Sequence, residues 1–280
     1  MKIGEYKLYS IETSEFALDG GAMFGIIPKA IWSEKMPSDS LNRISMVTRS
    51  LLLVSDSRKI LIDTGNGSKW SEKYLDIYNI DLSIFNIKSS LKKYDFTANE
   101  ITDVICTHLH FDHAGGNTIY HKESLIPTFP NATYWISDKN WRLANHPNQK
   151  DRGSFMERDW KVLGQNNMIN LVNDKFLPGI DIYFTEGHTD GLMHPIISDS
   201  KKTLFYGADI FPTAAHIPIP WVMSYDLRPV QTVKEKTILL KKMYGEEWIL
   251  FFEHDPFYQA CTISMKGNHY YMNSPVVISE

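Results

Sequence analysis

The chain has 280 residues, 43% of them hydrophobic and 22% charged, which is typical of a folded globular protein with a sizeable core. Its net charge of −4 is accompanied by no run of Lys or Arg, which argues against nucleic acid as a partner. No apolar stretch reaches the length of a membrane span, and the first ten residues lack the apolar segment of a secretory signal, so we expect no membrane partner and a cytoplasmic location.

Apolar periodicity divides the chain into strands and helices. Alternating or continuous apolar runs predict strands, and apolar residues three and four apart predict helices. In chain order we predict strands at 46–55 and 59–63 joined as a hairpin, a helix at 83–94 with Ile84, Ile87, Leu91 and Tyr94 on one face, a second helix from Thr97, strands at 103–107 and 132–136, a helix at 137–144, strands at 180–184, 193–197 and 203–206, a helix at 230–243 and a final strand at 248–252.

Local signals support two of these helices and single out one irregular segment. Thr97-Ala-Asn-Glu has the pattern of a capping box, and Ser137 or Asp138 can cap the helix that follows. Residues 19–38 fit neither period, and their glycines, prolines and scattered apolar side chains predict a long functional loop.

The order of the elements predicts the fold class. Strands are followed by helices and then by strands again, and the second half repeats the pattern of the first. We therefore predict an α/β protein with a four-layer αββα sandwich. Because no Pro/Ser-rich linker or low-complexity tract interrupts the chain, we expect residues 1–280 to form a single domain.

The run T-H-L-H-F-D-H-A-G-G begins at residue 107, directly after an apolar strand. At the end of that strand His108 and His110 can share a face, because strand residues two apart point the same way. Asp112 and His113 follow in the next turn. Burying these groups without a cation would cost about 1–3 kcal/mol each. Four donors within six residues exceed what one ion takes from so short a run, which favours two adjacent metal ions.

This H-x-H-x-D-H run resembles the signature of the metallo-β-lactamase superfamily. The resemblance implies three further ligands, and matching motifs are present: E-G-H-T-D-G contains His188, Y-G-A-D contains Asp209 and F-F-E-H-D-P contains His254. It implies that one ion takes His108, His110 and His188, that the other takes Asp112, His113 and His254, and that Asp209 lies between them.

Two adjacent cations predict hydrolytic chemistry. A water shared by two ions has its pKa lowered from about 15.7 toward neutrality, so a metal-bridging hydroxide can attack a carbonyl or phosphoryl centre. Asp112 is placed to orient the hydroxide and to pass a proton to the leaving group. Nitrogen and oxygen donors suit two zinc ions, with cobalt, manganese or iron as alternatives. The di-iron redox relatives usually carry a carboxylate where this chain has His110, which disfavours a redox role.

The residues around the cluster narrow the substrate class. H-L-H-F-D-H-A-G-G-N and the stretch 207–226 resemble N-acyl-homoserine lactonases of the quorum-quenching branch, so we expect the enzyme to open a lactone ring. We expect Phe111 to line the metal site, and Phe24, Trp32 and Trp221 to contact the acyl tail, although the two tryptophans could equally be packing residues.

One departure from the lactonases concerns the group that polarises the substrate carbonyl. Several of these enzymes place a tyrosine three residues after the bridging aspartate, where this chain has Pro212. We expect His216 to act in its place as a catalytic residue, with Tyr225 as the second candidate.

Two alternatives from other classes stay open. One is a hydrolase of the same fold that acts on another ester or on an organophosphate triester. The other is a non-catalytic ligand-binding protein of this fold, which is disfavoured because all seven ligands are present. The sequence also leaves a homodimer open, and it does not determine the acyl-chain preference or the native metal.

Overall fold

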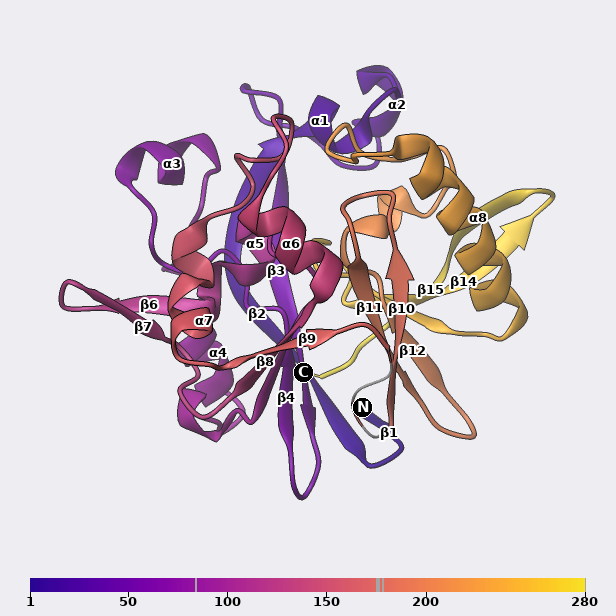
Figure 1. Cartoon of the computed structure of the whole chain (residues 1–280). Helices are drawn as coiled ribbons and strands as arrows, with labels where there is room; N and C mark the ends of the chain where they lie inside the picture. Colours follow the sequence, from indigo (N-terminus) through magenta and orange to yellow (C-terminus); the bar gives the residue numbers. More distant parts are fainter. Residues whose placement is uncertain (84, 175–176, 178, 280) are drawn as a thin grey trace.

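A computed structural model of the chain describes residues 1–83, 85–174, 177 and 179–279 (Figure 1). In this described part, one sheet has the strand order β1-β2-β3-β4-β5-β8-β9. Its strands are β1 (Lys2–Ile3), β2 (Tyr6–Asp19), β3 (Arg43–Val54), β4 (Lys59–Ile62), β5 (Asp103–Cys106), β8 (Thr133–Ser137) and β9 (Ile169–Val172). Strands β1 to β4 pair antiparallel, whereas β4, β5, β8 and β9 pair parallel.

The second sheet follows the chain in the order β10-β11-β12-β13-β14-β15. Its strands are β10 (Ile180–Thr185), β11 (Leu192–Ser198), β12 (Thr203–Tyr206), β13 (Ile249–Phe251), β14 (Ala260–Lys266) and β15 (His269–Val276). Neighbouring strands pair antiparallel except β12 and β13, which are parallel. A separate hairpin joins β6 (Thr118–His121) to β7 (Ser124–Pro127).

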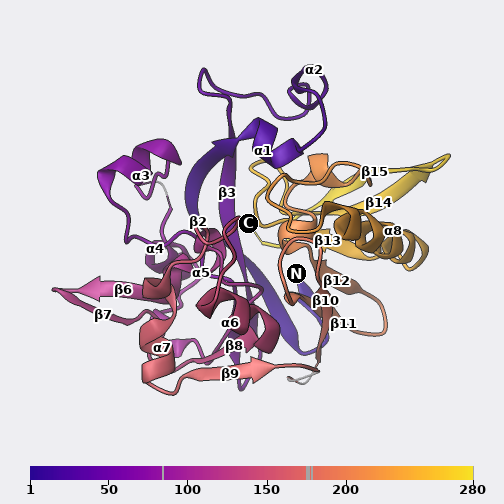
Figure 2. The same ribbon diagram turned by 45° about the horizontal axis from the view of Figure 1, so that its top comes forward.

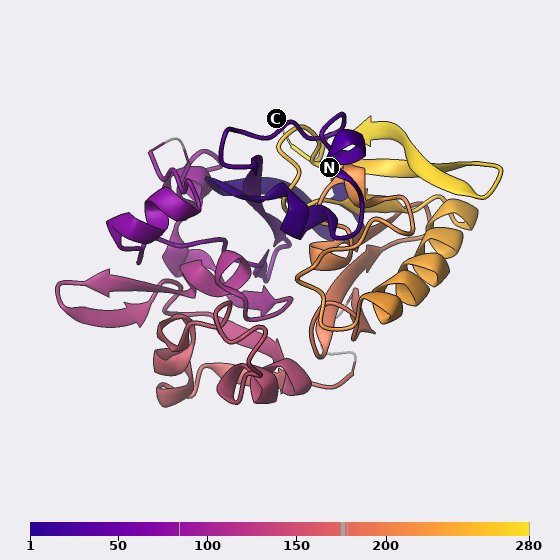
Figure 3. The same ribbon diagram turned by 90° about the horizontal axis from the view of Figure 1, so that it is seen from above.

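The two sheets pack face to face, and helices cover their outer faces (Figures 1 and 3). Alternation in β3 shows how the layers form: Leu51 and Leu53 enter the core between the sheets, and Leu52 enters the core under the helices. The helices are α1 (Gly20–Phe24), α2 (Lys29–Trp32), α3 (Glu72–Ile77), α4 (Ile87–Lys92), α5 (Phe111–Ala114), α6 (Asp138–Asn145), α7 (Lys161–Gln165) and α8 (Pro229–Gly245).

This arrangement confirms the predicted αββα sandwich. Residues of α4 and α7 pack on the first sheet, and α8 packs Leu239, Leu240 and Met243 on the second. In Figure 2 the segment of α1 and α2 lies over one end of the sandwich. None of the described helices combines the length and the apolar character needed to cross a membrane.

Most predicted elements are confirmed, including the 46–63 hairpin, the strands that precede each metal motif, and α8. The capping box at Thr97 is also confirmed, although it begins only a single 3₁₀ turn, Ala98–Glu100. Ser137 is the residue that caps α6, and its hydroxyl accepts a hydrogen bond from the Asn140 amide.

Three predictions were wrong. The 248–252 strand is not the last, because β14 and β15 follow it. The helix predicted at 83–94 covers only Ile87–Lys92 among the described residues, and position 84 lies outside them. Residues 19–38 are not a plain loop: α1 begins at the Asp19 cap and α2 follows Pro28, and both pack apolar side chains into a common cluster.

A buried lysine of α8 holds the segment 216–221, which follows the Asp209 motif. The Lys236 ammonium donates to the carbonyl oxygens of His216, Pro218 and Trp221 at 2.6, 2.9 and 2.7 Å. We expect Lys236→Met to lower the free energy of unfolding by about 3 kcal/mol or more, because one buried and two partly buried carbonyl oxygens lose their donor. Thermal unfolding measures this loss. Lys234→Met on the exposed side of the same helix is the control, and an equal melting temperature for both variants would contradict the role assigned to Lys236.

Candidate metal centre

The strand directions bring the predicted ligands to one edge of the sandwich. His108 follows β5, His188 follows β10, Asp209 follows β12 and His254 follows β13. Strand β10 is antiparallel to β11, which is antiparallel to β12, and β12 is parallel to β13. Their carboxyl ends therefore meet at the same edge of the second sheet. A backbone bond of 2.9 Å from the Met193 amide to the Thr107 carbonyl joins that edge to the end of β5.

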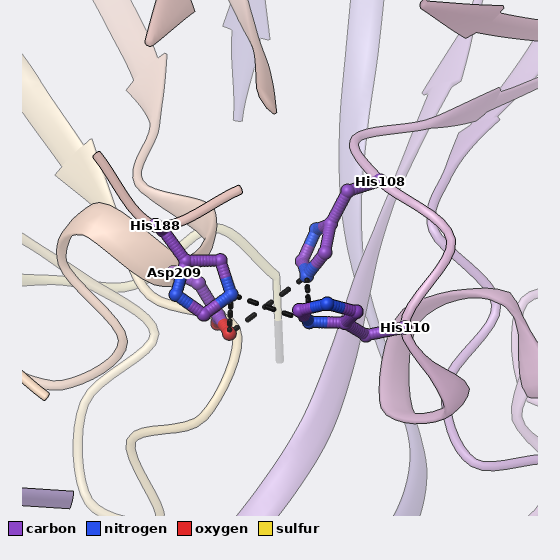
Figure 4. Close-up of side chains that lie close together, drawn as sticks. All are labelled: His108, His110, His188 and Asp209. Atoms are coloured by element: carbon purple, nitrogen blue, oxygen red, sulfur yellow. Dashed lines mark hydrogen bonds and ion pairs between the residues drawn. The ribbon is translucent and has the colours of Figure 1, made fainter. Parts of the chain in front are cut away.

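The seven predicted ligands lie together in two buried groups. Within each group the donor atoms lie within 4.8 Å of one another, and both groups could hold a metal ion. Figure 4 shows the first group, with His108 and His110 on one side facing His188 and Asp209 on the other. The first group is His108, His110, His188 and Asp209, and the second is Asp112, His113 and His254.

Asp209 faces both groups, one with each carboxylate oxygen. Its Oδ2 lies 3.1 Å from His188 Nε2, on the side of the first group. Its Oδ1 lies 3.3 Å from His113 Nε2 and 3.2 Å from His254 Nε2, on the side of the second. Asp209 is therefore placed so that each of its carboxylate oxygens could contribute to one of the two groups.

Acceptors behind the cluster fix the orientation of most of the imidazoles. His188 Nδ1 lies 2.9 Å from Asp226 Oδ1, and His254 Nδ1 lies 3.0 Å from the Val47 carbonyl. His113 Nδ1 lies 3.2 Å from Asp63 Oδ2 and 2.9 Å from Glu253 Oε2. Each of these contacts leaves Nε2 directed at the centre of the cluster, as in most metal sites where a ligating histidine donates its other N–H to an outer acceptor.

The chemistry of the cluster fits two divalent cations. His254 Nε2 and His113 Nε2 face each other at 3.2 Å, and His108 Nε2 lies 3.0 Å from His110 Nδ1. Burial and the neighbouring imidazoles hold the pKa of His108 well below its ordinary value, which keeps the ring in the neutral form that a metal binds. Asp209 Oδ1 is also buried without a hydrogen-bond donor. Imidazole and carboxylate donors suit zinc and other divalent transition metals.

Two glycines allow the H-x-H-x-D-H run to pack closely against the first sheet. A Cβ on Gly115 would come within 2.3 Å of the Asn66 carbonyl oxygen, and one on Gly116 within 2.2 Å of the Thr64 carbonyl oxygen. Only glycine fits at these two positions. These glycines therefore allow the backbone after His113 to approach the first sheet closely.

A cavity of about 230 Å³ opens onto the cluster. Several of the predicted ligands form part of its wall, and one side is apolar. The residues lining it are Leu18, Met23, Met46, Tyr78, His110, Phe111, Asp112, Lys150, Asp151, Gly153, Ser154, His188, Asp209, Met223, Tyr225 and His254.

The predicted substrate contacts divide into two sets. Phe111 and Tyr225 line the cavity. Phe24, Trp32 and Trp221 do not; they pack on one another behind the wall, with Phe24 stacked on Trp32 at 5.3 Å. The packing interpretation of the two tryptophans is therefore the one that the geometry favours.

His216 lies outside the cavity lining, in the same packed cluster. Its Nδ1 pairs with the Thr213 hydroxyl at 2.7 Å and its Nε2 with the Met23 carbonyl at 2.9 Å. Burial lowers the pKa of His216 to about 3. Both ring nitrogens are thus engaged within the protein, and we do not retain His216 as the group that polarises the substrate.

Sequence reasoning missed several residues at this site, among them four that contribute to the cavity or to the support of the histidines. Tyr78 and Asp151 line the cavity, and Asp226 and Glu253 hold metal-facing histidines from behind. Two of the four had a local signal, because Glu253 directly precedes His254 and Asp226 ends the stretch 207–226. Tyr78 and Asp151 come from segments with no motif.

Two comparisons relate the sequence to known proteins. Residues 46–254 match the metallo-beta-lactamase superfamily. The chain is similar to N-acyl homoserine lactonase AiiB of Rhizobium rhizogenes, with 23% identity over 211 residues that cover 71% of this chain and 74% of the relative. It is also similar to an N-acyl homoserine lactonase of Bacillus thuringiensis, with 24% identity over 220 residues that cover 73% of this chain and 79% of the relative.

Solved structures share the fold along nearly the whole chain. A probable metal-dependent hydrolase from Staphylococcus aureus is 29% identical with a TM-score of 0.85, and the match covers 99% of this chain and 100% of that one. The dizinc quorum-quenching lactonase AidC, in complex with a product, is 21% identical with a TM-score of 0.80, covering 99% and 97%. The superfamily match spans most of the sequence and includes every predicted ligand, so this chain belongs to the metallo-beta-lactamase superfamily and is a metal-dependent hydrolase.

Proposed function

We propose that this protein opens the lactone ring of N-acyl-homoserine lactones and so acts as a quorum-quenching enzyme with two zinc ions. The observation that carries the proposal is the placement of Asp209 between the two ligand groups, at a cavity with an apolar side. The lactonase relatives support the substrate class. Leu18, Met23 and Met223 would contact the acyl chain, and Phe111 would pack beside the ring.

The proposed reaction breaks the ester bond of the ring. Two divalent ions, when bound by the seven ligands, would supply an activated water and withdraw electrons from the carbonyl oxygen. The water oxygen bonds to the carbonyl carbon, and the bond from that carbon to the ring oxygen breaks. Asp112, which lines the cavity, takes the proton from the water and passes it to the ring oxygen. The product carries one carboxylate and one hydroxyl, and the second proton of the water is released to the solvent.

We further propose that Tyr225 donates the hydrogen bond that polarises the substrate carbonyl. Burial raises the pKa of Tyr225, and the nearby Asp112 and Tyr78 raise it further, so its hydroxyl stays protonated and able to donate. Burial, followed by Asp112, likewise raises the pKa of Tyr78. Both phenol groups therefore lie near Asp112 in the wall of the cavity.

Tyr225→Phe is expected to lower kcat/KM for the lactone by about 100-fold, mostly through kcat, because one oxyanion donor is lost. Tyr78→Phe should cost less than tenfold, since Tyr78 stacks on Phe111 at 5.1 Å and contributes mainly to the wall. Tyr74→Phe, outside the cavity, is the control. Steady-state kinetics of metal-loaded variants measure the ranking, and a larger loss in Tyr78→Phe than in Tyr225→Phe would reverse the assignment.

A hydrolysis screen tests the substrate class. A pH-indicator assay of fully metallated enzyme should detect ring opening of acyl-homoserine lactones with tails of different lengths. Simple aryl esters and an organophosphate triester are run beside them. If lactones are inert and the triester or an ester is hydrolysed, the lactonase assignment fails and another hydrolase activity of this fold replaces it. If nothing is hydrolysed, the non-catalytic alternative gains support.

A further inference from the structure

The segment 147–155 is fixed to both halves of the candidate metal centre. On one side the Phe111 amide donates to the Ser154 carbonyl at 2.9 Å, and Phe155 forms a bridge with His110. On the other side the Lys150 ammonium donates to the carbonyls of Ser224, Tyr225 and Asp226 at 2.9, 2.7 and 3.0 Å. The segment is therefore a rigid wall of the cavity, held between the H-x-H-x-D-H run and the loop that supports His188.

Asp151 lies in this wall, close to Asn148 and Lys150, and its two carboxylate oxygens are left without a hydrogen bond among the described residues. Asp151 lines the cavity and is only 5% exposed. Both of its carboxylate oxygens are buried without a hydrogen-bond donor among the described residues, although its own amide is bonded to Asn148. Burial raises the pKa of Asp151, which reflects the cost of keeping this acid away from water. Buried polar groups left without a partner are rare, and one in a binding cavity points to a ligand.

The charges and apolar side chains around Asp151 limit the kind of group that can donate a hydrogen bond to it. Lys150 is a cationic residue of the same wall, and two divalent ions bound by the seven ligands would add further positive charge. A cationic substrate group would be repelled there. A neutral N–H group would not be repelled. The apolar side chains of Met23, Met46 and Met223 line the same cavity and suit an alkyl chain. A secondary amide that carries an alkyl chain combines these two properties.

We propose that Asp151 is a specificity-determining residue that accepts a hydrogen bond from the amide N–H of an N-acylated substrate. This inference rests on the proposed lactonase function and extends it, because it states how the enzyme distinguishes an N-acyl lactone from a lactone without an amide.

The test compares two substrates that differ only at the proposed contact. One is N-hexanoyl-homoserine lactone, and the other is the α-hexanoyloxy lactone in which oxygen replaces the amide N–H. Wild-type enzyme is expected to prefer the amide by about 10- to 100-fold in kcat/KM, the range for a hydrogen bond to a charged group. Asp151→Ala should reduce this ratio to about one and change kcat/KM for the oxygen analogue by less than about threefold. Asp151→Asn should keep part of the preference, because its amide oxygen still accepts.

Two further measurements separate recognition from damage to the fold. Metal content and melting temperature of Asp151→Ala should match those of Glu157→Gln, an exposed control outside the cavity. Binding of the ring-opened product N-hexanoyl-homoserine to metal-loaded protein, measured by calorimetry, should weaken about tenfold in Asp151→Ala but not in the control.

Several results would overturn the inference. They are equal losses for both substrates in Asp151→Ala, a wild-type ratio near one, or an Asp151-dependent preference for the free amine of homoserine lactone over its amide. In each case lactone turnover by wild-type enzyme would leave the proposed function intact. If fully metallated wild-type enzyme opens no lactone at all, the proposed function fails and the inference fails with it.

Discussion

Asp209→Ala is expected to lower kcat/KM by at least about 10³-fold and to leave the purified protein with no more than one tightly bound metal equivalent. The reason is geometric: Asp209 directs one oxygen to His188 and the other to His113 and His254, so its loss weakens both ligand groups together. Elemental analysis of the purified variant and steady-state hydrolysis of its best substrate measure the two effects.

A matched control shows that the loss depends on position. Asp56→Ala removes an exposed carboxylate from the β3–β4 hairpin, far from the cluster along the sheet, and should keep full activity and metal content. If Asp209→Ala retained two equivalents and more than a tenth of the activity, Asp209 would not be the residue that joins the two ions.

That the seven candidate ligands gather at one place could be predicted from the sequence, because each is part of a local motif. Four of them lie within residues 108–113, and the other three lie just after apolar strands. The structure adds which atoms face each other. His110 presents Nδ1 to the cluster, whereas His188 and His254 present Nε2. This choice of nitrogen depends on partners that are distant in the sequence. Asp226 and the Val47 carbonyl are 38 and 207 residues from the histidines that they orient.

The fold class could be predicted, but β2 could not. Strand β2 has a bulge between Glu12 and Ser14, which shifts its pairing with β3 and breaks the two-residue alternation that predicts a strand. Thr13 and Ser14 are buried polar residues whose hydroxyls pair with the Thr48 hydroxyl at 2.6 and 2.8 Å. Two consecutive polar residues favour a turn when only the sequence is known, because the sequence does not show that another strand supplies their hydrogen-bond partner.

The walls of the cavity were the least predictable part of the site. An aromatic side chain near a metal motif suits both a substrate contact and a packing role, and Trp32 is buried against Phe24 rather than in the cavity. For Asp151 the sequence favours an exposed position, because the residue lies in a polar segment. It is buried because residues 147–155 pack onto the H-x-H-x-D-H run.

Removal of the metal ions is expected to abolish hydrolysis and to lower the melting temperature by at least about 10 °C. Ligand binding to the native state alone contributes about 4 kcal/mol per site at a thousandfold excess over Kd. In this protein each ion would also neutralise buried carboxylates, since Asp63, Asp209 and Glu253 all lie within or directly behind the cluster and are at most 7% exposed. Protein treated with a chelator and then desalted should therefore unfold earlier than the untreated protein.

Reloading then distinguishes the two ligand groups and identifies the metal. Zinc, cobalt and manganese are added separately to the stripped protein, and activity, melting temperature and bound equivalents are measured at each step. The two groups differ in their number of imidazoles: the first has three together with Asp209, and the second has two together with Asp112. They should therefore fill with different affinities, and activity should rise mainly with the second equivalent, because the proposed reaction needs both ions to activate the water and the carbonyl. Binding of less than one equivalent, with no rise in melting temperature, would contradict the two-metal site and favour a non-catalytic ligand-binding protein.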